Sequence, residues 1–519
     1  MTALSGKSTP FGELIAEVTV APGGHRSIPV RAPFTGVVMG EIPAGGQADV
    51  ETAIELARSF QPGWAARPFA ERGRIFLRFH DLLLKRQNEV MDLIQIETGK
   101  ARAHAFEEIL DTAIVARYYA RRARRLLRPR WRKGALPLLT HTTERRVPLG
   151  TVGFITPWNF PLTLGITDAI AALLAGNAVI LKPDPQTSFT ALRALRLLRE
   201  AGLPREVFTV VTGEGAVAGQ ALVERADYLM FTGSNRIGRL IAARAGERLV
   251  GCSLELGGKN PLLVLPDADL DKAAEGTVRA AFVGAGQVCI SIERVYVHES
   301  VFPRFLELLE ARTRKIKLGA AFDYSMDVGS LTTAAQLQKI EEHVADAVSK
   351  GAAVVAGGRA RPDLGPLFYE PTILTNVRPG MKVFAEETFG PVVSVYPVAD
   401  EQEAIERANA TPFGLSASIW TRHTRKGARL ARAIRAGSVN VNEAYAAAWG
   451  SVDSPVGGMK ESGLRPRHGA EGILKFTESQ TVAVQHWLPI APSLGMSQRF
   501  YARWMTRLVR AIRWMPGLR

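Results

Sequence analysis

The sequence predicts an α/β protein made of two parallel-sheet units with a cleft between them. Between residues 150 and 265, short apolar strands alternate with helical segments, an order typical of right-handed βαβ units. A second stretch with the same alternation runs from Asp267 to about Asn442. A chain of 519 residues is also too long for a single hydrophobic core, so we expect two or three domains.

The individual elements follow from the spacing of apolar residues. From Asp49 to about Arg125 that spacing is helical, and residues 129–141 then predict an extended connector or edge hairpin. We expect helices beginning near Val50 and over residues 72–98, 103–119, 188–202, 215–224 and 236–246. We expect strands over residues 150–156, 178–181, 207–211, 228–231, 261–265, 294–297, 353–355, 371–374 and 392–397.

Composition and cysteine content indicate a globular cytoplasmic protein. Residues 1–10 have no apolar region typical of a signal peptide. The most apolar stretch, residues 162–181, contains Ala-Gly-Asn, which predicts a helix, a turn and a buried strand and not a membrane span. Two cysteines, Cys252 and Cys289, exclude a disulfide framework, and no His/Cys cluster has metal-ligand spacing, so we expect no metal.

The net charge of +15 is concentrated in two segments. Residues 117–133 hold nine basic residues and no acid, and residues 497–519 hold six arginines and no acid. Together these two segments carry the whole excess. They therefore predict basic patches on an otherwise balanced protein.

Cys289 is the candidate nucleophile. It ends Gly286-Gln287-Val288-Cys289, a loop of small residues after a helical segment. A thiolate attacks carbonyl carbon readily, whereas an isolated cysteine is more often a small buried apolar residue. We give Cys252, which precedes an apolar strand, that structural interpretation.

Glu255 is the candidate base. It lies between Leu254 and Leu256 at the end of a strand, before Gly257-Gly258. Burial raises the pKa of a carboxylic acid and suits it to proton transfer, although a glutamate in a turn is usually solvated or a helix cap.

Two turns supply candidate binding groups. In Thr156-Pro157-Trp158-Asn159-Phe160-Pro161, a fixed Asn159 side chain can donate a hydrogen bond to an oxygen that gains charge, unless it only stabilises the turn. Gly233-Ser234 follows a strand and opens a helix, whose N-terminus can face a phosphate. This turn lacks the GxGxxG pattern and is weak evidence by itself, as is Lys182 before Pro183.

Taken together, these segments closely resemble the aldehyde dehydrogenase superfamily from about Val50 to Val484. Their order matches that superfamily, as do the separation of 34 residues between Glu255 and Cys289 and the later segment Glu387-Thr388-Phe389-Gly390-Pro391. The resemblance is strongest to the NADP-type succinate-semialdehyde dehydrogenase branch.

The resemblance implies a mechanism. Cys289 would attack the aldehyde, Asn159 and the Cys289 amide would hold the oxyanion, hydride would pass to NADP or NAD, and Glu255 would activate the water that cleaves the thioester. The remaining matched positions would bind the cofactor: Thr156, Trp158, Lys182, Asp184, Pro185, Gly233, Ser234, Leu256, Glu387 and Phe389.

The resemblance also implies a division of the chain. Residues 1–127 and 149–257 would form a Rossmann-like cofactor domain, and residues 258–455 the catalytic domain. Residues 128–148 and 475–496 would form a small β-hairpin element that joins subunits into a homo-oligomer, dimer or tetramer. Residues 497–519 would form a basic C-terminal helix.

Two departures from the family pattern affect the cofactor and the substrate. Pro185 stands where many NAD-using relatives carry a glutamate that binds the adenosine ribose, which favours NADP, although Asp184 can restore some repulsion. Thr167 and Val283 stand where relatives acting on succinate semialdehyde carry carboxylate-binding arginines. An apolar aldehyde of medium or long chain is therefore the alternative substrate.

Residues 497–519 predict a two-faced helix. At 100° per residue, five arginines fall within about 120°, opposite Phe500, Trp504 and Leu508. Such a helix can lie on an anionic membrane, or its apolar face can pack on the catalytic domain or on a neighbouring subunit.

Two other functions have weaker support in the sequence. A CoA-acylating relative generally lacks the glutamate at position 255. A nucleic-acid-binding module would need a recognised fold beside the basic charge, so we expect no nucleic-acid partner.

Overall fold

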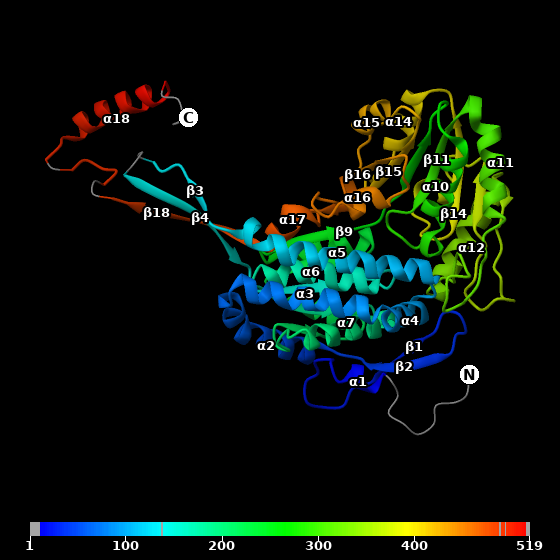
Figure 1. The fold of residues 1–519 in the computed structure, drawn as a ribbon, viewed down its shortest axis with the longest axis horizontal. Helices are drawn as coiled ribbons and strands as arrows, with labels where there is room; N and C mark the ends of the chain where they lie inside the picture. The colour runs from blue at the N-terminus through cyan, green and yellow to red at the C-terminus, as the bar shows by residue number, and fades with distance from the viewer. Residues whose placement is uncertain (1–10, 136–138, 487–488, 494, 515–519) are drawn as a thin grey trace.

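The computed structural model describes residues 11–135, 139–486, 489–493 and 495–514. Two large sheets organise the body of the protein, and a three-stranded arm projects from one end (Figure 1). The α/β fold class is confirmed, whereas the domain limits given above remain predictions. Among the described residues, no helix combines the length and apolar character needed to cross a bilayer.

The first sheet has the strand order β17-β9-β8-β5-β6-β7. Strands β5 to β9 are parallel and β17 joins antiparallel to β9. The strands are β5 (Thr151–Ile155), β6 (Ala178–Lys182), β7 (Phe208–Val210), β8 (Tyr228–Thr232), β9 (Gly251–Glu255) and β17 (Gly463–Leu464).

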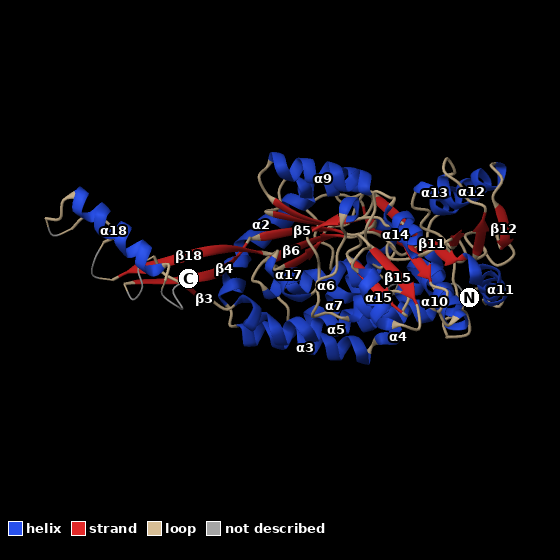
Figure 2. Ribbon diagram, turned by 90° about the horizontal axis from the view of Figure 1, so that it is seen from above, coloured by secondary structure: helices blue, strands red, loops and turns tan. Residues whose placement is uncertain are grey.

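Helices cover both faces of this sheet (Figure 2). In β6, Ala178 and Ile180 belong to one buried cluster while Val179 and Leu181 belong to another, as strand alternation requires. The helices are α2 (Gln47–Ala66), α8 (Gln220–Val223) and α9 (Asn235–Glu247) towards the smaller cluster, and α3 (Phe69–Lys85), α4 (Gln87–Thr98), α5 (Arg102–Leu127), α6 (Pro161–Leu174) and α7 (Ser188–Glu200) towards the larger.

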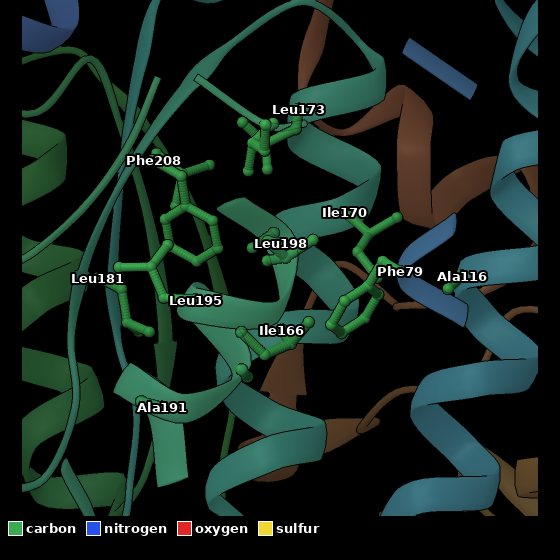
Figure 3. Packing of buried hydrophobic residues seen from close by; sticks show 14 of the residues in the cluster. Phe79, Ala116, Ile166, Ile170, Leu173, Leu181, Ala191, Leu195, Leu198 and Phe208 are labelled. Atoms are coloured by element: carbon green, nitrogen blue, oxygen red, sulfur yellow. The ribbon is translucent and has the colours of Figure 1, made fainter. Parts of the chain in front are cut away.

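Helix α6 shows how the sequence produces the core. Pro161 occupies its first turn, all fourteen of its residues are buried, and the chain leaves it through Gly176 at φ +99°, a conformation that favours glycine. Its apolar side chains pack with those of α3 and α7 (Figure 3). The prediction of a helix, a turn and a buried strand over residues 162–181 is confirmed.

The second sheet has the order β12-β13-β14-β11-β10-β15-β16, parallel except at its β12 edge. Its strands are β10 (Asn260–Val264), β11 (Ile292–His298), β12 (Ala353–Ala356), β13 (Thr372–Thr375), β14 (Val392–Val398), β15 (Ser416–Trp420) and β16 (Ser438–Val441). The helices beside it are α10 (Leu270–Phe282), α11 (Phe302–Thr313), α12 (Ala334–Ser349), α13 (Lys382–Ala385), α14 (Glu401–Asn409), α15 (Thr424–Ala431) and α16 (Ala446–Gly450).

The arm consists of β3 (Arg130–Arg132), β4 (Thr140–Pro148) and β18 (Thr477–Gln485), in the order β18-β4-β3. Beyond it, α18 (Gln498–Ile512) lies away from the body in both views (Figures 1 and 2), and none of its residues is buried. Packing of α18 on the catalytic domain of the same chain is therefore wrong, whereas packing on a neighbouring subunit and contact with a membrane remain predictions.

Several predicted boundaries differ from the structure. The helix expected over residues 72–98 is two helices, because Arg86 leaves the helical conformation between them. Helix α5 continues to Leu127, eight residues beyond the predicted end, so much of the first basic segment is helical. Among the described residues, five strands were not predicted: β1 (Ser27–Arg31), β2 (Val38–Pro43), β15, β16 and β17. No domain or element was predicted for residues 456–474. They include α17 (Gly469–Leu474), which contacts α5 and α6.

Candidate active site

The candidate site lies at the carboxyl edge of the first sheet, where the strand order reverses. From β5 the chain goes outward to β6 and β7, then returns to place β8 on the other side of β5. Ligands of open α/β sheets bind at such a switch point. Thr156 and Trp158 follow β5, Gly233 and Ser234 follow β8, and Glu255 ends β9.

A hollow with about 690 Å³ of non-protein space opens at this point, and we call it the cofactor hollow. Nine of the thirteen predicted site residues line it, contributed by both halves of the molecule: Trp158, Asn159, Gly233, Ser234, Glu255, Leu256, Cys289, Glu387 and Phe389. Residues separated by up to 231 positions in the sequence therefore face one space.

Cys289 is held by its neighbours on a sharply turned loop. Gly286 has φ +71°, and a Cβ there would lie 2.0 Å from the carbonyl oxygen of Gly390, so no other residue fits. The Asn260 side chain donates hydrogen bonds to the carbonyl oxygens of Cys289 (2.8 Å) and Ser291 (2.7 Å).

Burial, with the nearby carboxylates of Glu255 and Glu387, raises the pKa of Cys289 to about 12. The thiol therefore keeps its proton at neutral pH until a base removes it.

Glu255 is a buried carboxylic acid with an unused oxygen. Its residue is 7% exposed, and Oε1 has no hydrogen-bond partner among the described residues. Burial raises its pKa to about 7, against the attraction of Arg467. An acid that changes protonation near neutral pH, with a free oxygen in a shared hollow, is suited to accept a proton.

The Asn159 side chain is fixed against the cysteine loop. Its Nδ2 donates to the carbonyl oxygen of Gln287 at 2.9 Å. The backbone carbonyl oxygen of Asn159 accepts from Lys100 Nζ at 2.7 Å, and Lys100 is in turn paired with buried Glu108. One N–H of the amide remains for an oxygen near Cys289.

Glu387 and Phe389 form the opposite wall. Glu387 Oε1 accepts from the Gly258 amide at 2.8 Å, and burial, with the charge of Glu293, raises its pKa to about 7. Phe389 has φ +57° and its ring lies edge-on to Trp158 at 5.7 Å. The Glu293 carboxylate fixes this turn by accepting from the amides of Thr388 and Phe389.

The residues present fit a dinucleotide. Ser234 precedes α9 without a side-chain cap, which leaves the first N–H groups of the helix for a phosphate. A Cβ at Gly233 would lie 2.6 Å from the Phe231 ring, and one at Gly257 would lie 2.6 Å from Glu387. Lys339, which the sequence analysis did not identify, is the only cation among the described lining residues.

The other predicted cofactor residues lie on the same sheet edge but outside the lining of the cofactor hollow. The Thr156 amide donates to the carbonyl oxygen of Lys182 at 3.2 Å, and Lys182 is 4% exposed, with its pKa lowered by burial. Asp184 Oδ1 accepts from the Gln186 amide at 3.0 Å, across Pro185.

A second hollow, which we call the substrate pocket, meets the first at Asn159, Leu164 and Cys289. None of its other residues was predicted from the sequence as a site residue. Thr167 and Val283 do not line it, and the Thr167 hydroxyl donates to the Thr163 carbonyl oxygen. The other lining residues are Glu107, Asp111, Phe160, Thr163, Val288, Ile290, Tyr445 and Trp449.

Comparisons with known proteins agree with this geometry. The model of the aldehyde dehydrogenase family matches residues 20–482. A Mycolicibacterium smegmatis protein named as a putative NADP(+) succinate-semialdehyde dehydrogenase is 51% identical over 493 residues, 95% of each chain. A glutarate-semialdehyde dehydrogenase of Pseudomonas aeruginosa is 36% identical over 87% of this chain and 93% of its own.

Solved structures give the same result. The crystal structure of an E. coli NADP-dependent enzyme is 36% identical, with a TM-score of 0.85 over 89% of this chain and 95% of that one. An aldehyde dehydrogenase from Brucella melitensis biovar abortus is 33% identical, with a TM-score of 0.87 over 94% of this chain and 100% of that one. On this sequence and structural similarity, the chain belongs to the aldehyde dehydrogenase family, oxidoreductases that act on aldehydes with NAD(P).

Proposed function

We propose that this protein oxidises an aldehyde to its carboxylic acid through a thioester on Cys289. The observation that carries the proposal is the meeting of the cofactor hollow and the substrate pocket at Cys289, with Glu255 in the first of them. In the overall reaction, one aldehyde, one water and one NAD(P)⁺ give one carboxylate, one NAD(P)H and two protons.

In the first half of the reaction the Cys289 thiol gives its proton to water, and the sulfur attacks the carbonyl carbon. Asn159 Nδ2 and the Cys289 amide donate to the resulting oxyanion. Glu387, Phe389 and the N-terminus of α9 would hold the cofactor, which would supply the acceptor for the hydride that leaves this carbon. Loss of hydride converts the adduct to a thioester.

In the second half Glu255 removes a proton from water, which attacks the thioester and releases the acid. Its free Oε1 and its pKa near 7 support this role. The same group argues against a CoA-acylating function, in which CoA replaces water.

The test is acid formation by the purified protein without CoA. We expect turnover in wild type and none in Cys289→Ala. A requirement for CoA, or activity in Cys289→Ala, would contradict the proposal.

The cofactor is NADP in preference to NAD. Pro185 stands where many NAD-using relatives carry a glutamate that binds the adenosine ribose, and a carboxylate there would repel a 2′-phosphate. The relatives named for NADP(+) support this preference, although some similar solved structures are described with NAD⁺. Their names also make succinate semialdehyde the first substrate to test.

The protein acts as a homo-oligomer joined through the arm. Strand β18 forms one edge of the three-stranded sheet and is exposed over most of its length. An exposed edge strand pairs readily with another chain. The partner is a second copy, and removal of residues 477–486 is expected to give monomers in sedimentation experiments.

Helix α18 contacts an anionic membrane surface. Its arginines lie on one side of the helix. On the other side, Phe500 is 58% exposed and Trp504 is 46% exposed. Positive charge beside aromatic side chains suits anionic lipid headgroups. The full-length protein should sediment with phosphatidylserine vesicles and not with phosphatidylcholine vesicles, and a chain lacking residues 497–519 should lose this binding. Equal binding by the truncated chain would refute the contact.

A further inference from the structure

The substrate pocket is walled by apolar side chains but carries two acids. Phe160, Leu164, Val288 and Ile290 line it beside Cys289. These side chains offer a short hydrocarbon chain an environment without water. The polar groups lie on two other elements, α5 and the segment around α16.

Glu107 and Asp111 are four residues apart on α5, so they lie on the same face of the helix. Both Glu107 carboxylate oxygens accept from the Tyr445 hydroxyl, at 2.8 and 2.9 Å. Asp111 Oδ1 accepts from Trp449 Nε1 at 2.8 Å. Asp111 is 9% exposed, and its Oδ2 has no hydrogen-bond partner among the described residues. The Thr163 hydroxyl, which also lines the pocket, lowers the pKa of Asp111 as a neutral donor but completes no hydrogen bond of normal geometry, so Oδ2 stays available to a stronger donor.

No lysine or arginine is among the described residues that line this pocket. The buried cations nearby already have carboxylate partners. Lys100 Nζ lies 2.7 Å from Glu108, and Arg467 pairs with Asp168. The exposed Arg279 pairs with Glu443.

A carboxylate substrate would lose its water here without gaining a cation, and it would face two acids of its own sign. A cationic group would instead supply the missing donor and a favourable charge. The aromatic rings of Tyr445 and Trp449 also favour a cation at their faces. Burial raises the pKa of Asp111 to about 6, which still leaves it mostly ionised at neutral pH, and a bound cation would lower that pKa.

We propose that the pocket formed by Glu107, Asp111, Tyr445 and Trp449 selects aldehydes that carry a positively charged amino group a few carbons from the carbonyl. This inference rests on the proposed aldehyde oxidation at Cys289, and it assigns the substrate a charge opposite to that of succinate semialdehyde. Uncharged alkyl aldehydes fit the apolar wall but leave Asp111 Oδ2 unsatisfied, so they rank between the two.

The test compares kcat/KM for four short aldehydes with the full-length protein and NADP. The cationic probe is 4-(trimethylammonio)butanal, which cannot cyclise, with 3-aminopropanal as the donor-bearing form. The neutral probe is pentanal and the anionic probe is succinate semialdehyde. We expect the cationic aldehydes to exceed pentanal by about tenfold and succinate semialdehyde by about a hundredfold.

Two isosteric variants identify the residues responsible. Asp111→Asn and Glu107→Gln should each reduce the ratio of cationic to anionic kcat/KM by tenfold or more, because each removes one charge and keeps the shape. Asp81→Asn, which changes a carboxylate that is 79% exposed on α3, is the matched control and should leave the ratio unchanged.

Protection of Cys289 from alkylation can be measured without turnover, so it also tests variants with low activity. Iodoacetamide alkylation of Cys289, followed by mass spectrometry to distinguish it from Cys252, should be slowed by butyltrimethylammonium and not by butyrate. A wild-type preference for succinate semialdehyde or for pentanal, or protection by butyrate alone, would overturn the inference while leaving aldehyde oxidation intact. Absence of turnover with every aldehyde would instead overturn the proposed function.

Discussion

Replacement of Glu255 by glutamine tests the chemistry at the thioester step. Glutamine keeps the shape of the side chain but cannot accept a proton from water. General base catalysis contributes about 10²–10⁴-fold, so steady-state turnover should fall by that factor. The oxidative half-reaction precedes the need for this base, so one equivalent of NADPH should still form in a burst. Stopped-flow absorbance at 340 nm measures the burst and the steady state together.

The pH dependence of turnover gives a second quantitative test of Glu255. With a pKa of about 7, about one-tenth of Glu255 is ionised at pH 6 and nine-tenths at pH 8, so wild-type turnover should rise about tenfold between them. Glu255→Gln should lose this rise.

Glu387 has a similar raised pKa and must be separated from Glu255. Glu387→Gln should keep the rise and weaken cofactor binding instead. Full steady-state turnover in Glu255→Gln, or an unchanged pH rise, would refute the assignment of the base.

Three further outcomes follow from the structure. Asn159→Ala should lower kcat by about 10²–10³-fold, because one oxyanion donor is lost, and single-turnover kinetics would show the loss in the NADPH burst itself. Pro185→Glu should shift the ratio of kcat/KM towards NAD by tenfold or more, because a carboxylate there repels a 2′-phosphate, and an unchanged ratio would refute this assignment. Phe79→Ala, at a fully buried position of the core in Figure 3, should destabilise the protein by about 3–5 kcal/mol in urea denaturation, if unfolding is reversible.

The sequence predicted the parts of the fold that depend on local patterns. The buried strands β5, β6 and β8 are short apolar runs bounded by turns, and such runs predict strands well. Strands β15 and β16 were missed because Ser416–Trp420 and Ser438–Val441 mix small and polar residues with apolar ones. Their burial in the second sheet results from pairing between strands distant in sequence, which periodicity does not report.

In the candidate site, too, local patterns were predictable from the sequence and long-range contacts were not. Cys289, Glu255 and Asn159 could be identified because each lies in a short segment with unusual local composition. Glu107 and Asp111 lie in an amphipathic helix that also contains the buried acid Glu108, and nothing in their spacing separates an acid facing a pocket from one paired inside the core. Only the approach of α16 to α5 distinguishes them, because it brings Trp449 to Asp111 and Tyr445 to Glu107.

Chemistry and substrate choice therefore depend on different parts of the chain. The cofactor hollow is built from turns after the strands of both sheets. The substrate pocket is built from α5, the start of α6, the cysteine loop and the segment around Trp449. Among the described residues, Asn159, Leu164 and Cys289 line both spaces. A change in the charge of α5 can alter which aldehyde reaches Cys289 without moving the groups that oxidise it. Similarity over 95% of the chain therefore supports the same type of reaction in this protein and its relatives. The substrate has to be inferred from the few side chains that face the pocket.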